Sequence, residues 1–196
     1  FKRPIPYNQL SAQTLITIDD GVLAQTNNIS LISDELALTG DVSVNVPAQG
    51  EASMALLAHV EKGHAKFAKH YYPHLLMGDD LVNYLDRAIT DGELSQAEII
   101  FDGNFSDFPF TDKPGLFNVN AQLIGSHFVF DEQWPAIEKL HGTLDFTNNS
   151  MLITAHAGKL EGLDVQGVEV AIDDLSNEQI LTVDANIEKQ LPEHVS

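Results

Sequence analysis

The sequence predicts a mainly β fold: an extended antiparallel β-repeat, shaped as a groove or half-open sandwich, with a short helical insert around residues 64–90. Three observations support this prediction. Apolar and polar residues alternate with a period of two in several stretches, the segments between them are short and turn-like, and helical spacing is confined to one region. With 196 residues, 43% of them hydrophobic, the chain can fill a core. We expect residues 1–196 to form a single β module excised from a longer chain.

The first strand is expected at residues 35–46, with the sequence ELALTGDVSVNV. Val42 and Val44 share one parity with the other apolar residues of this stretch, and polar residues occupy the other parity. This alternation is typical of a half-buried strand, in which successive side chains point to opposite faces. Gly40 is expected to mark a kink or a bulge, because a glycine in a strand interior often does so.

A second strand is expected at residues 116–124, where apolar residues alternate with asparagine and glutamine. After Gly125 the apolar residues change parity, and a bulge at this point would keep them on one face of the sheet. The apolar residues before and after the change are Phe117, Val119, Leu123, Phe128 and Phe130. Shorter alternating stretches predict four further strands, at residues 140–146, 150–157, 161–172 and 179–187.

The helical insert is predicted from a change of period between residues 64 and 90. A short helical run is expected to end before Pro73, because proline cannot continue a helix and restricts the residue before it. Apolar residues then recur at helical spacing from Leu81, and Gly92 is expected to end the second helix.

Two segments of the chain are alike, one beginning at Glu35 and the other at Glu98. Each has an apolar run, a glycine five residues after the glutamate, a second apolar run, a proline and another glycine, which is Gly50 in the first segment and Gly115 in the second. This likeness suggests a repeated strand–turn–strand unit laid side by side, as in extended β-repeat proteins.

The charge of the chain excludes several classes of partner. Ten lysine and arginine residues against 29 aspartate and glutamate residues give a formal net charge of -19. Such a chain repels phosphate backbones and anionic bilayer surfaces, so we expect no nucleic acid and no membrane docking through basic patches. No cysteine is present, which removes disulfides and cysteine nucleophiles. The sequence also has no apolar stretch near the ~20 residues that a membrane span needs.

Histidines are the first candidates for a chemical site, because four of them are close in sequence. They are His59, His64, His70 and His74. The last two have the i, i+4 spacing of a helical metal pair, but Pro73 lies between them. We therefore expect exposed histidines and no metal site.

Motifs for nucleophilic or phosphoryl chemistry are missing from the sequence, which has no G-x-S-x-G, no H-E-x-x-H and no glycine-rich phosphate loop. Adjacent acids such as Asp173 and Asp174 fit turns or solvated surfaces. A glycan hydrolase with two converging carboxylates stays an alternative. We expect a non-enzymatic protein that needs no cofactor.

Phenylalanines are concentrated between residues 101 and 130. They fit either an ordinary dry core or an apolar sheet face that is left open to hold an apolar ligand. Within this region, the two prolines of FSDFPFTDKPGLF break the ladder of strand hydrogen bonds. The phenylalanines at 105, 108 and 110 then either line the mouth of the sheet or form a packed corner between two strands.

Short motifs follow one another between residues 71 and 175. In chain order they are Tyr72-Pro73, Gly92, Gly103, Asp107-Phe108-Pro109-Phe110, Gly115-x-Phe117-x-Val119-x-Ala121, Trp134-Pro135 and Leu140-x-Gly142-x-Leu144-x-Phe146. In this order they resemble the YhdP branch of the AsmA-like family, periplasmic β-groove proteins related to TamB. Residues 14–60 resemble it more loosely. The chain departs from the family at Tyr72, where leucine is usual, and it lacks the family's early helical tryptophan near Asn83.

The resemblance implies a periplasmic segment of a protein that is anchored in the inner membrane of Gram-negative bacteria and bridges toward the outer membrane. It implies a non-enzymatic role, in which an apolar groove holds or conducts phospholipid for outer-membrane homeostasis. Expected partners are phospholipid acyl chains, neighbouring β-repeat segments of the same chain and other envelope proteins. The residues expected to face lipid are Val42, Val44, Phe105, Phe108, Phe110, Phe117, Val119, Leu123, Phe128 and Phe130. A closed β-sandwich that recognises protein or glycan stays the alternative.

Overall fold

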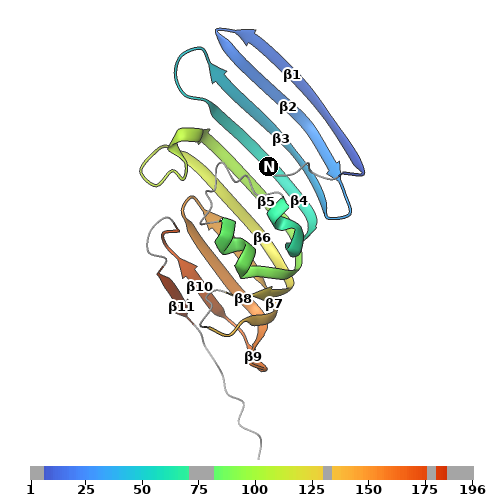
Figure 1. The fold of residues 1–196 in the computed structure, drawn as a ribbon, viewed down its shortest axis with the longest axis vertical. Coiled ribbons are helices and arrows are strands. Elements are labelled where there is room, and N and C mark those ends of the chain that lie inside the picture. Colours follow the sequence, from blue (N-terminus) through green and yellow to red (C-terminus); the bar gives the residue numbers. More distant parts are fainter. Residues whose placement is uncertain (1–6, 71–81, 130–133, 176–179, 185–196) are drawn as a thin grey trace, which may run out of the picture.

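The structure is a computed structural model that describes residues 7–70, 82–129, 134–175 and 180–184 (Figure 1). Its strands form one open sheet, in which each strand pairs antiparallel with its neighbours in chain order and β9 pairs with β8 at the side. The strands are β1 (Gln9–Asp19), β2 (Gly21–Ile32), β3 (Leu36–Pro47), β4 (Ser53–His64), β5 (Ile89–Asn104), β6 (Gly115–Phe128), β7 (Ile137–Thr147), β8 (Ser150–Leu160), β9 (Leu163–Val165), β10 (Val168–Ile172) and β11 (Leu181–Asp184). The predicted mainly β, antiparallel fold is confirmed.

The sheet does not close into a sandwich or a barrel. β1 pairs with β2 and β11 pairs with β10, so these two strands are the edges of one twisted sheet. The described residues contain no second sheet to pack against the first. The closed β-sandwich considered as an alternative is therefore wrong for this part of the chain.

The strands predicted from alternation are present, but one of them is split. The segment predicted as one strand at 161–172 is split into β9 and β10, because the chain turns at Gly167, which has a φ of 64° and donates its backbone N–H to Ala155 O. Both pieces pair with β8. The bulge expected at Ile124 and Gly125 is confirmed by a register shift between Leu123 and Ser126. β1, β2, β4 and the part of β5 before Glu98 were not predicted.

The helical insert lies between β4 and β5, as predicted. Its described parts are the 3-10 helix η1 (Ala65–His70) and a helix over 82–88, and β5 begins directly after this helix. Gly92 lies inside β5 and does not end the helix. A Cβ on Gly92 would lie 2.4 Å from Ser126 Cα, so the glycine permits close contact with β6. The predicted helix start and His74 fall outside the described residues.

In the two similar segments β3 pairs with β4 and β5 pairs with β6, but the first glycine of each segment lies inside a strand and not in a turn. Gly40 lies within the continuous strand β3, paired with Ala58, and the β3 register shift occurs at Ala37–Leu38 instead. A Cβ on Gly40 would lie 2.5 Å from Leu57 O, so the glycine permits close contact with β4. Gly115 does open a strand, whereas Gly50 lies in the turn before β4.

The core occupies only part of the sheet. Every buried side chain among the described residues lies between Ala58 and Leu175, and the strands β1–β3 contain none. The largest cluster joins Tyr84, Leu85 and Ala88 of the helix to apolar side chains of β5–β8 and β10. The sheet is therefore packed toward its C-terminal end and open toward its N-terminal end.

Candidate functional site

One face of the sheet is apolar across nearly all its strands. The strand register brings Val42 opposite Leu56, Leu56 opposite Phe101 and Phe101 opposite Phe117, so these side chains form a row on one side. We call this side the apolar face. Its members include Leu10, Ile16, Ile18, Val22, Ala24, Leu31, Leu38, Val42, Val44, Val46, Met54, Leu56, Ile99, Phe101, Phe117, Val119, Leu144, Phe146, Met151, Ile153, Val170 and Ile172.

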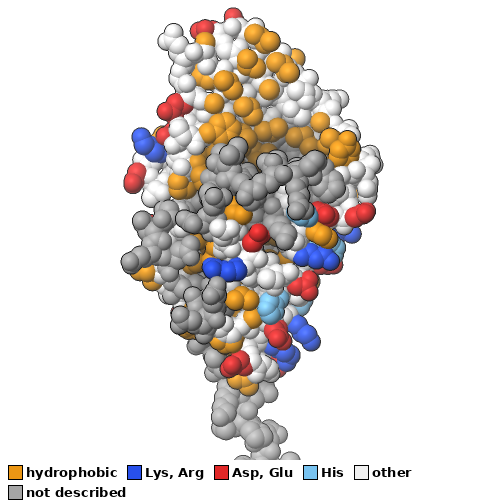
Figure 2. Space-filling view, viewed as in Figure 1, with side chains coloured by type: hydrophobic (Ala, Val, Ile, Leu, Met, Phe, Trp, Pro, Cys, Tyr) orange, Lys and Arg blue, Asp and Glu red, His pale blue; other side chains and the backbone are white. Residues whose placement is uncertain are grey.

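The apolar face is open on β1–β3. Large side chains there remain exposed to solvent: Ile16 by 58%, Ile18 by 77% and Val46 by 47%. Figure 2 shows hydrophobic side chains gathered on this end of the face. A contiguous exposed apolar surface of this kind is uncommon in isolated proteins and marks a place where something apolar binds.

The same face is covered on β5–β8 and β10. The helix over 82–88 lies in front of these strands (Figure 1), and Tyr84 and Leu85 are 3% and 6% exposed against the core. The backbone N–H of Val129 donates to Ala88 O at 2.8 Å, which fixes the helix end beside β6. β4 is the boundary, because Met54 and Leu56 are half-buried and pack against the edge of this core.

The segment between β5 and β6 folds over the boundary as a corner. It begins with a 3-10 turn, η2 (Phe105–Asp107), and Asn104 Nδ2 donates to Asp107 Oδ2 at 2.8 Å. Phe105 N donates to Ala52 O at 3.1 Å, and Ser106 Oγ donates to Glu51, so the corner is tied to the β3–β4 turn. Of the two interpretations of this segment, the packed corner is the one observed.

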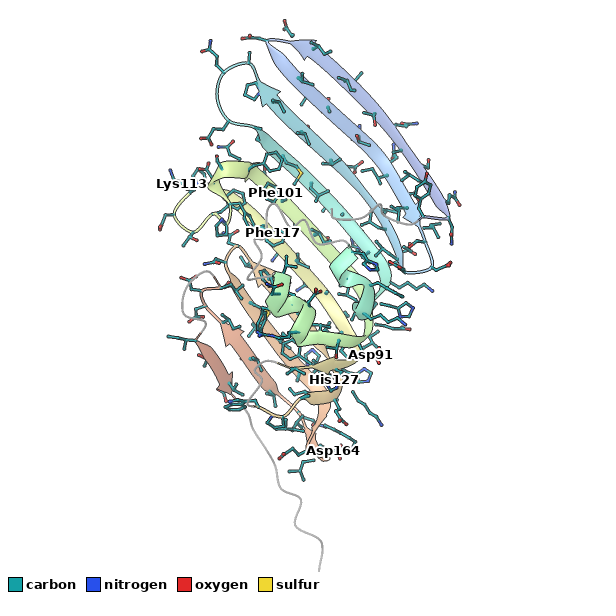
Figure 3. The ribbon with its side chains drawn as sticks, viewed as in Figure 1. Asp91, Phe101, Lys113, Phe117, His127 and Asp164 are labelled. Carbon is teal, nitrogen blue, oxygen red and sulfur yellow. The ribbon has the colours of Figure 1, made fainter. Side chains whose placement is uncertain are left out.

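Aromatic rings fill this corner around Phe101. The ring centroids of Phe105, Phe108 and Phe110 lie 5.9, 6.1 and 5.3 Å from that of Phe101. Phe117 lies 6.4 Å from it on the other side, and Figure 3 shows Phe101 and Phe117 on adjacent strands. Such offset and edge-to-face pairs each add to the stabilisation from burial.

The Phe110 ring packs directly on backbone. It covers the cross-strand pair Gly103 and Gly115, where an added Cβ would lie 2.5 and 2.2 Å from atoms of the ring. No residue but glycine leaves room for the ring at these two positions. Phe110 is consequently 3% exposed, although it lies in a connecting segment.

The structure distributes the predicted lipid-facing residues over the two parts of the apolar face. Val42 and Val44 are half-buried on the open part, and Phe105, Phe108 and Val119 are half-buried against the core. The remaining described members of the set are buried: Phe110, Phe117, Leu123 and Phe128 are 3%, 8%, 1% and 0% exposed. Phe130 lies outside the described residues.

Sequence reasoning missed much of the open part, including Ile16, Ile18 and Val22. The signal that could have found them is weak, because β1 and β2 also carry Leu15 and Leu23 on the opposite face. A strand that is exposed on both faces does not need strict alternation.

The histidine and acidic side chains of the described residues form pairs and turn contacts. No group of three or more histidine or acidic side chains there could hold a metal ion. His70 Nδ1 lies 3.0 Å from Glu35 Oε2, and His59 Nδ1 lies 3.9 Å from Glu98 Oε2. Asp174 accepts a hydrogen bond from Asn149, as expected of a turn residue.

A single carboxyl pKa is clearly shifted within the described residues. Lys159 Nζ donates a hydrogen bond to Asp164 Oδ1 at 2.7 Å, and this bond together with the lysine charge holds the pKa of Asp164 below its ordinary value. The pair is a solvent-exposed contact at the β8–β9 turn. It is not the desolvated, poised carboxyl of a catalytic site.

No helix within the described ranges has the length and apolar character needed to cross a membrane. Comparison with known proteins assigns the chain to a family, since the sequence profile of the family described as YhdP protein matches residues 1–195. The chain belongs to the YhdP family. This confirms the resemblance drawn from the short motifs, and the open antiparallel sheet is what that resemblance implied.

One member of the YhdP family is similar over most of the chain. A protein of Escherichia coli (strain K12), named intermembrane phospholipid transporter YhdP, is 32% identical over 160 residues, which cover 82% of this chain. The aligned part is 13% of that relative, so the chain spans a small fraction of the relative's length. No solved structure matches the chain.

Proposed function

We propose that this chain is a non-enzymatic segment that holds or conducts phospholipid, with the acyl chains lying on the open part of the apolar face. In this proposal the segment lies in the periplasm, within a protein that is anchored in the inner membrane and extends toward the outer membrane. The name of the Escherichia coli relative supports phospholipid as the cargo.

The observation that carries the proposal is the exposed apolar surface on β1–β3. Three aliphatic side chains of this surface, Ile16, Ile18 and Val46, are each about half or more exposed. Each methylene of an acyl chain that is exposed to water costs ~0.8 kcal/mol of free energy. A lipid lying on this surface recovers part of that free energy, and the side chains beneath it are covered at the same time.

The predicted lipid-facing residues take different roles in the proposal. Val42 and Val44 contact the acyl chain directly, because they lie on the open part. Phe105, Phe108 and Val119 border it at the edge of the core. The buried members are Phe110, Phe117, Leu123 and Phe128. They pack the core that supports the sheet, and they contact lipid only if the covering helix moves away from the face.

The two edge strands of the sheet allow further strands to pair there and extend the apolar face. Among the described residues, β1 and β11 each pair with another strand along one edge only. A free strand edge is a template for another strand. We propose that neighbouring β-repeat segments of the same chain occupy these edges, with other envelope proteins at the ends of the assembled surface.

The test compares Val44→Asp with Ser43→Asp in the full natural polypeptide. The two residues are adjacent on β3 and point to opposite faces, and each variant introduces one negative charge at a half-buried position. Phospholipid that copurifies with the protein is measured by native and lipid mass spectrometry. We expect Val44→Asp to lose most of it and Ser43→Asp to retain it. Equal retention by both variants would reject the open face as the lipid site.

A further inference from the structure

Two threonines interrupt the open part of the apolar face. Thr14 of β1 is opposite Thr26 of β2, and Thr26 is opposite Val42 of β3, so both threonine side chains lie on the apolar face. At the other paired positions of this face on strands β1–β4, the residues are alanine, valine, leucine, isoleucine, methionine or glycine. The two hydroxyls are therefore a polar point within an aliphatic surface.

The hydroxyl pair retains a donor for a ligand. The Oγ1 atoms of Thr14 and Thr26 lie 3.1 Å apart, so one hydroxyl donates its hydrogen to the other. Each hydroxyl has a single hydrogen, so the second one is not used within the pair. Among the described residues, neither hydroxyl has another protein hydrogen-bond partner. Thr14 is exposed and Thr26 is half-buried, so the pair is accessible from solvent.

A ligand that covers the pair has to replace the hydrogen bond that water makes with it. Hydrocarbon has no acceptor, so an acyl chain laid across the pair would leave a hydroxyl hydrogen without a partner, which is unfavourable. The part of a phospholipid that rests on Thr14 and Thr26 should therefore carry hydrogen-bond acceptors.

A phospholipid has two kinds of acceptor near its acyl chains, the ester carbonyls and the phosphate. The carbonyl is uncharged and belongs to the acyl chain itself, so it can meet a hydroxyl while the rest of the chain lies on aliphatic side chains. The phosphate is charged, and β1, β2 and β3 contain no lysine, arginine or histidine to pair with it. Two neutral hydroxyls thus suit the carbonyl better, because a phosphate without a cation is more favourably left in water.

The surroundings of the pair give a direction to the lipid. Exposed aliphatic side chains lie between the pair and the turn at 19–21: Ile16, Ile18 and Val22 are 58%, 77% and 40% exposed. Four residues separate Thr14 from Ile18, which is about 13 Å along a strand. β1 is an edge strand of the sheet, so water is available beside the pair for a charged headgroup (Figure 1).

We infer that the Thr14–Thr26 pair binds an ester carbonyl of a diacyl phospholipid and thereby favours ester-linked over ether-linked lipid. This inference rests on the proposed function, since it positions the lipid whose acyl chains lie on β1–β3. The chains extend from the pair over Ile16, Ile18 and Val22, and the phosphate stays in water beside β1. A cross-strand threonine pair also stabilises a sheet, so the test needs a readout that stability does not move.

The test is a competition between two phosphatidylglycerols for the full natural polypeptide. One has ester-linked chains and the other has ether-linked chains of equal length, so the second lacks the carbonyl oxygens and keeps the headgroup, charge and hydrocarbon. Vesicles of phosphatidylcholine present the two in equal amounts, and native and lipid mass spectrometry measures the ratio that is bound. We expect the wild type to bind the ester lipid in about threefold to tenfold excess, as for one net hydrogen bond.

Three variants assign this preference to the hydroxyls. Thr14→Val/Thr26→Val removes both hydroxyls and keeps β-branched side chains in the strands, and its bound ratio should fall to about one. Thr14→Ser/Thr26→Ser keeps the hydroxyls and should keep the preference. Thr17→Val/Thr39→Val is the matched control, because these exposed threonines lie on the opposite face of β1 and β3. Its bound ratio should equal that of the wild type.

Each other result has a definite meaning. Equal binding of the two lipids by the wild type would overturn the ester assignment and leave the acyl-chain surface intact, and this comparison needs no variant. A valine variant that binds less of both lipids at the wild-type ratio would also overturn the assignment, since the hydroxyls would then act on the headgroup or on the sheet. A wild type that binds neither lipid would overturn the proposed function itself.

Discussion

At the scale of single residues, the packing of Phe110 on two glycines explains how the β5–β6 connection is held. The ring lies on Gly103 and Gly115, which are opposite each other on neighbouring strands. The aromatic side chain supplies the apolar contact that the two glycines lack, a recognised way to stabilise glycine in a sheet. The last phenylalanine of the DFPF motif therefore has a structural role, because it anchors this connection to the sheet.

The glycine requirement gives the first stability prediction. Gly115→Ala should destabilise the protein by about 1–3 kcal/mol, since its Cβ would lie 2.2 Å from Phe110 Cδ1 and the ring must move. Gly63→Ala is the control, because its nearest neighbour would be Leu36 Cδ1 at an ordinary 3.4 Å. The free energy of unfolding from urea titration compares the two. If both variants unfold at the same urea concentration, Phe110 is not seated on Gly115.

At the scale of elements, the short helix over 82–88 determines where the apolar face is covered. Tyr84, Leu85 and Ala88 point into the core, and Asp86 and Arg87 are exposed on the opposite side of the helix. A helix of this length is not stable alone, so its place depends on this packing. The covered part of the face would become open if the helix left it.

Truncation of one helix side chain tests this dependence. Leu85→Ala should cost about 2–5 kcal/mol, as for other buried leucines, and should increase the fluorescence of a dye that binds exposed apolar surface. Asp86→Ala on the exposed side of the same helix should change stability by less than about 0.5 kcal/mol. An unfolding midpoint and a dye signal unchanged in Leu85→Ala would show that the helix does not cover the face.

Elements were predictable from the sequence where apolar and polar residues alternate along a strand. β3, β6, β7 and β8 alternate because their apolar side chains pack against a core or its border, and the bulge near Ser126 was visible as a change of parity. β1 and β2 were not found, because exposure on both faces leaves Leu15 and Leu23 on the polar side. The position of Gly92 was misread because its role, contact with Ser126, is a tertiary one.

At the scale of the whole molecule, one sheet carries two environments in succession. The apolar face is a dry core from β5 onward and an exposed surface on β1–β3, and the described phenylalanines between 101 and 130 belong to the packed part. Val42 and Val44, which the sequence predicted to share one face, lie on the open part of the apolar face. The sequence did not show where the covered part of the apolar face ends, because that boundary depends on a helix and a corner that fold back over the sheet.

The most direct test of the open surface uses two adjacent residues of β1. Leu15 and Ile16 are 61% and 58% exposed, and they point to opposite faces of the same strand. A photo-crosslinking amino acid is placed at each position in the full natural polypeptide, the cells are irradiated, and lipid adducts are measured by mass spectrometry. The account predicts phospholipid adducts at position 16 and few or none at position 15. Equal adducts at the two positions, or none at position 16, would contradict it.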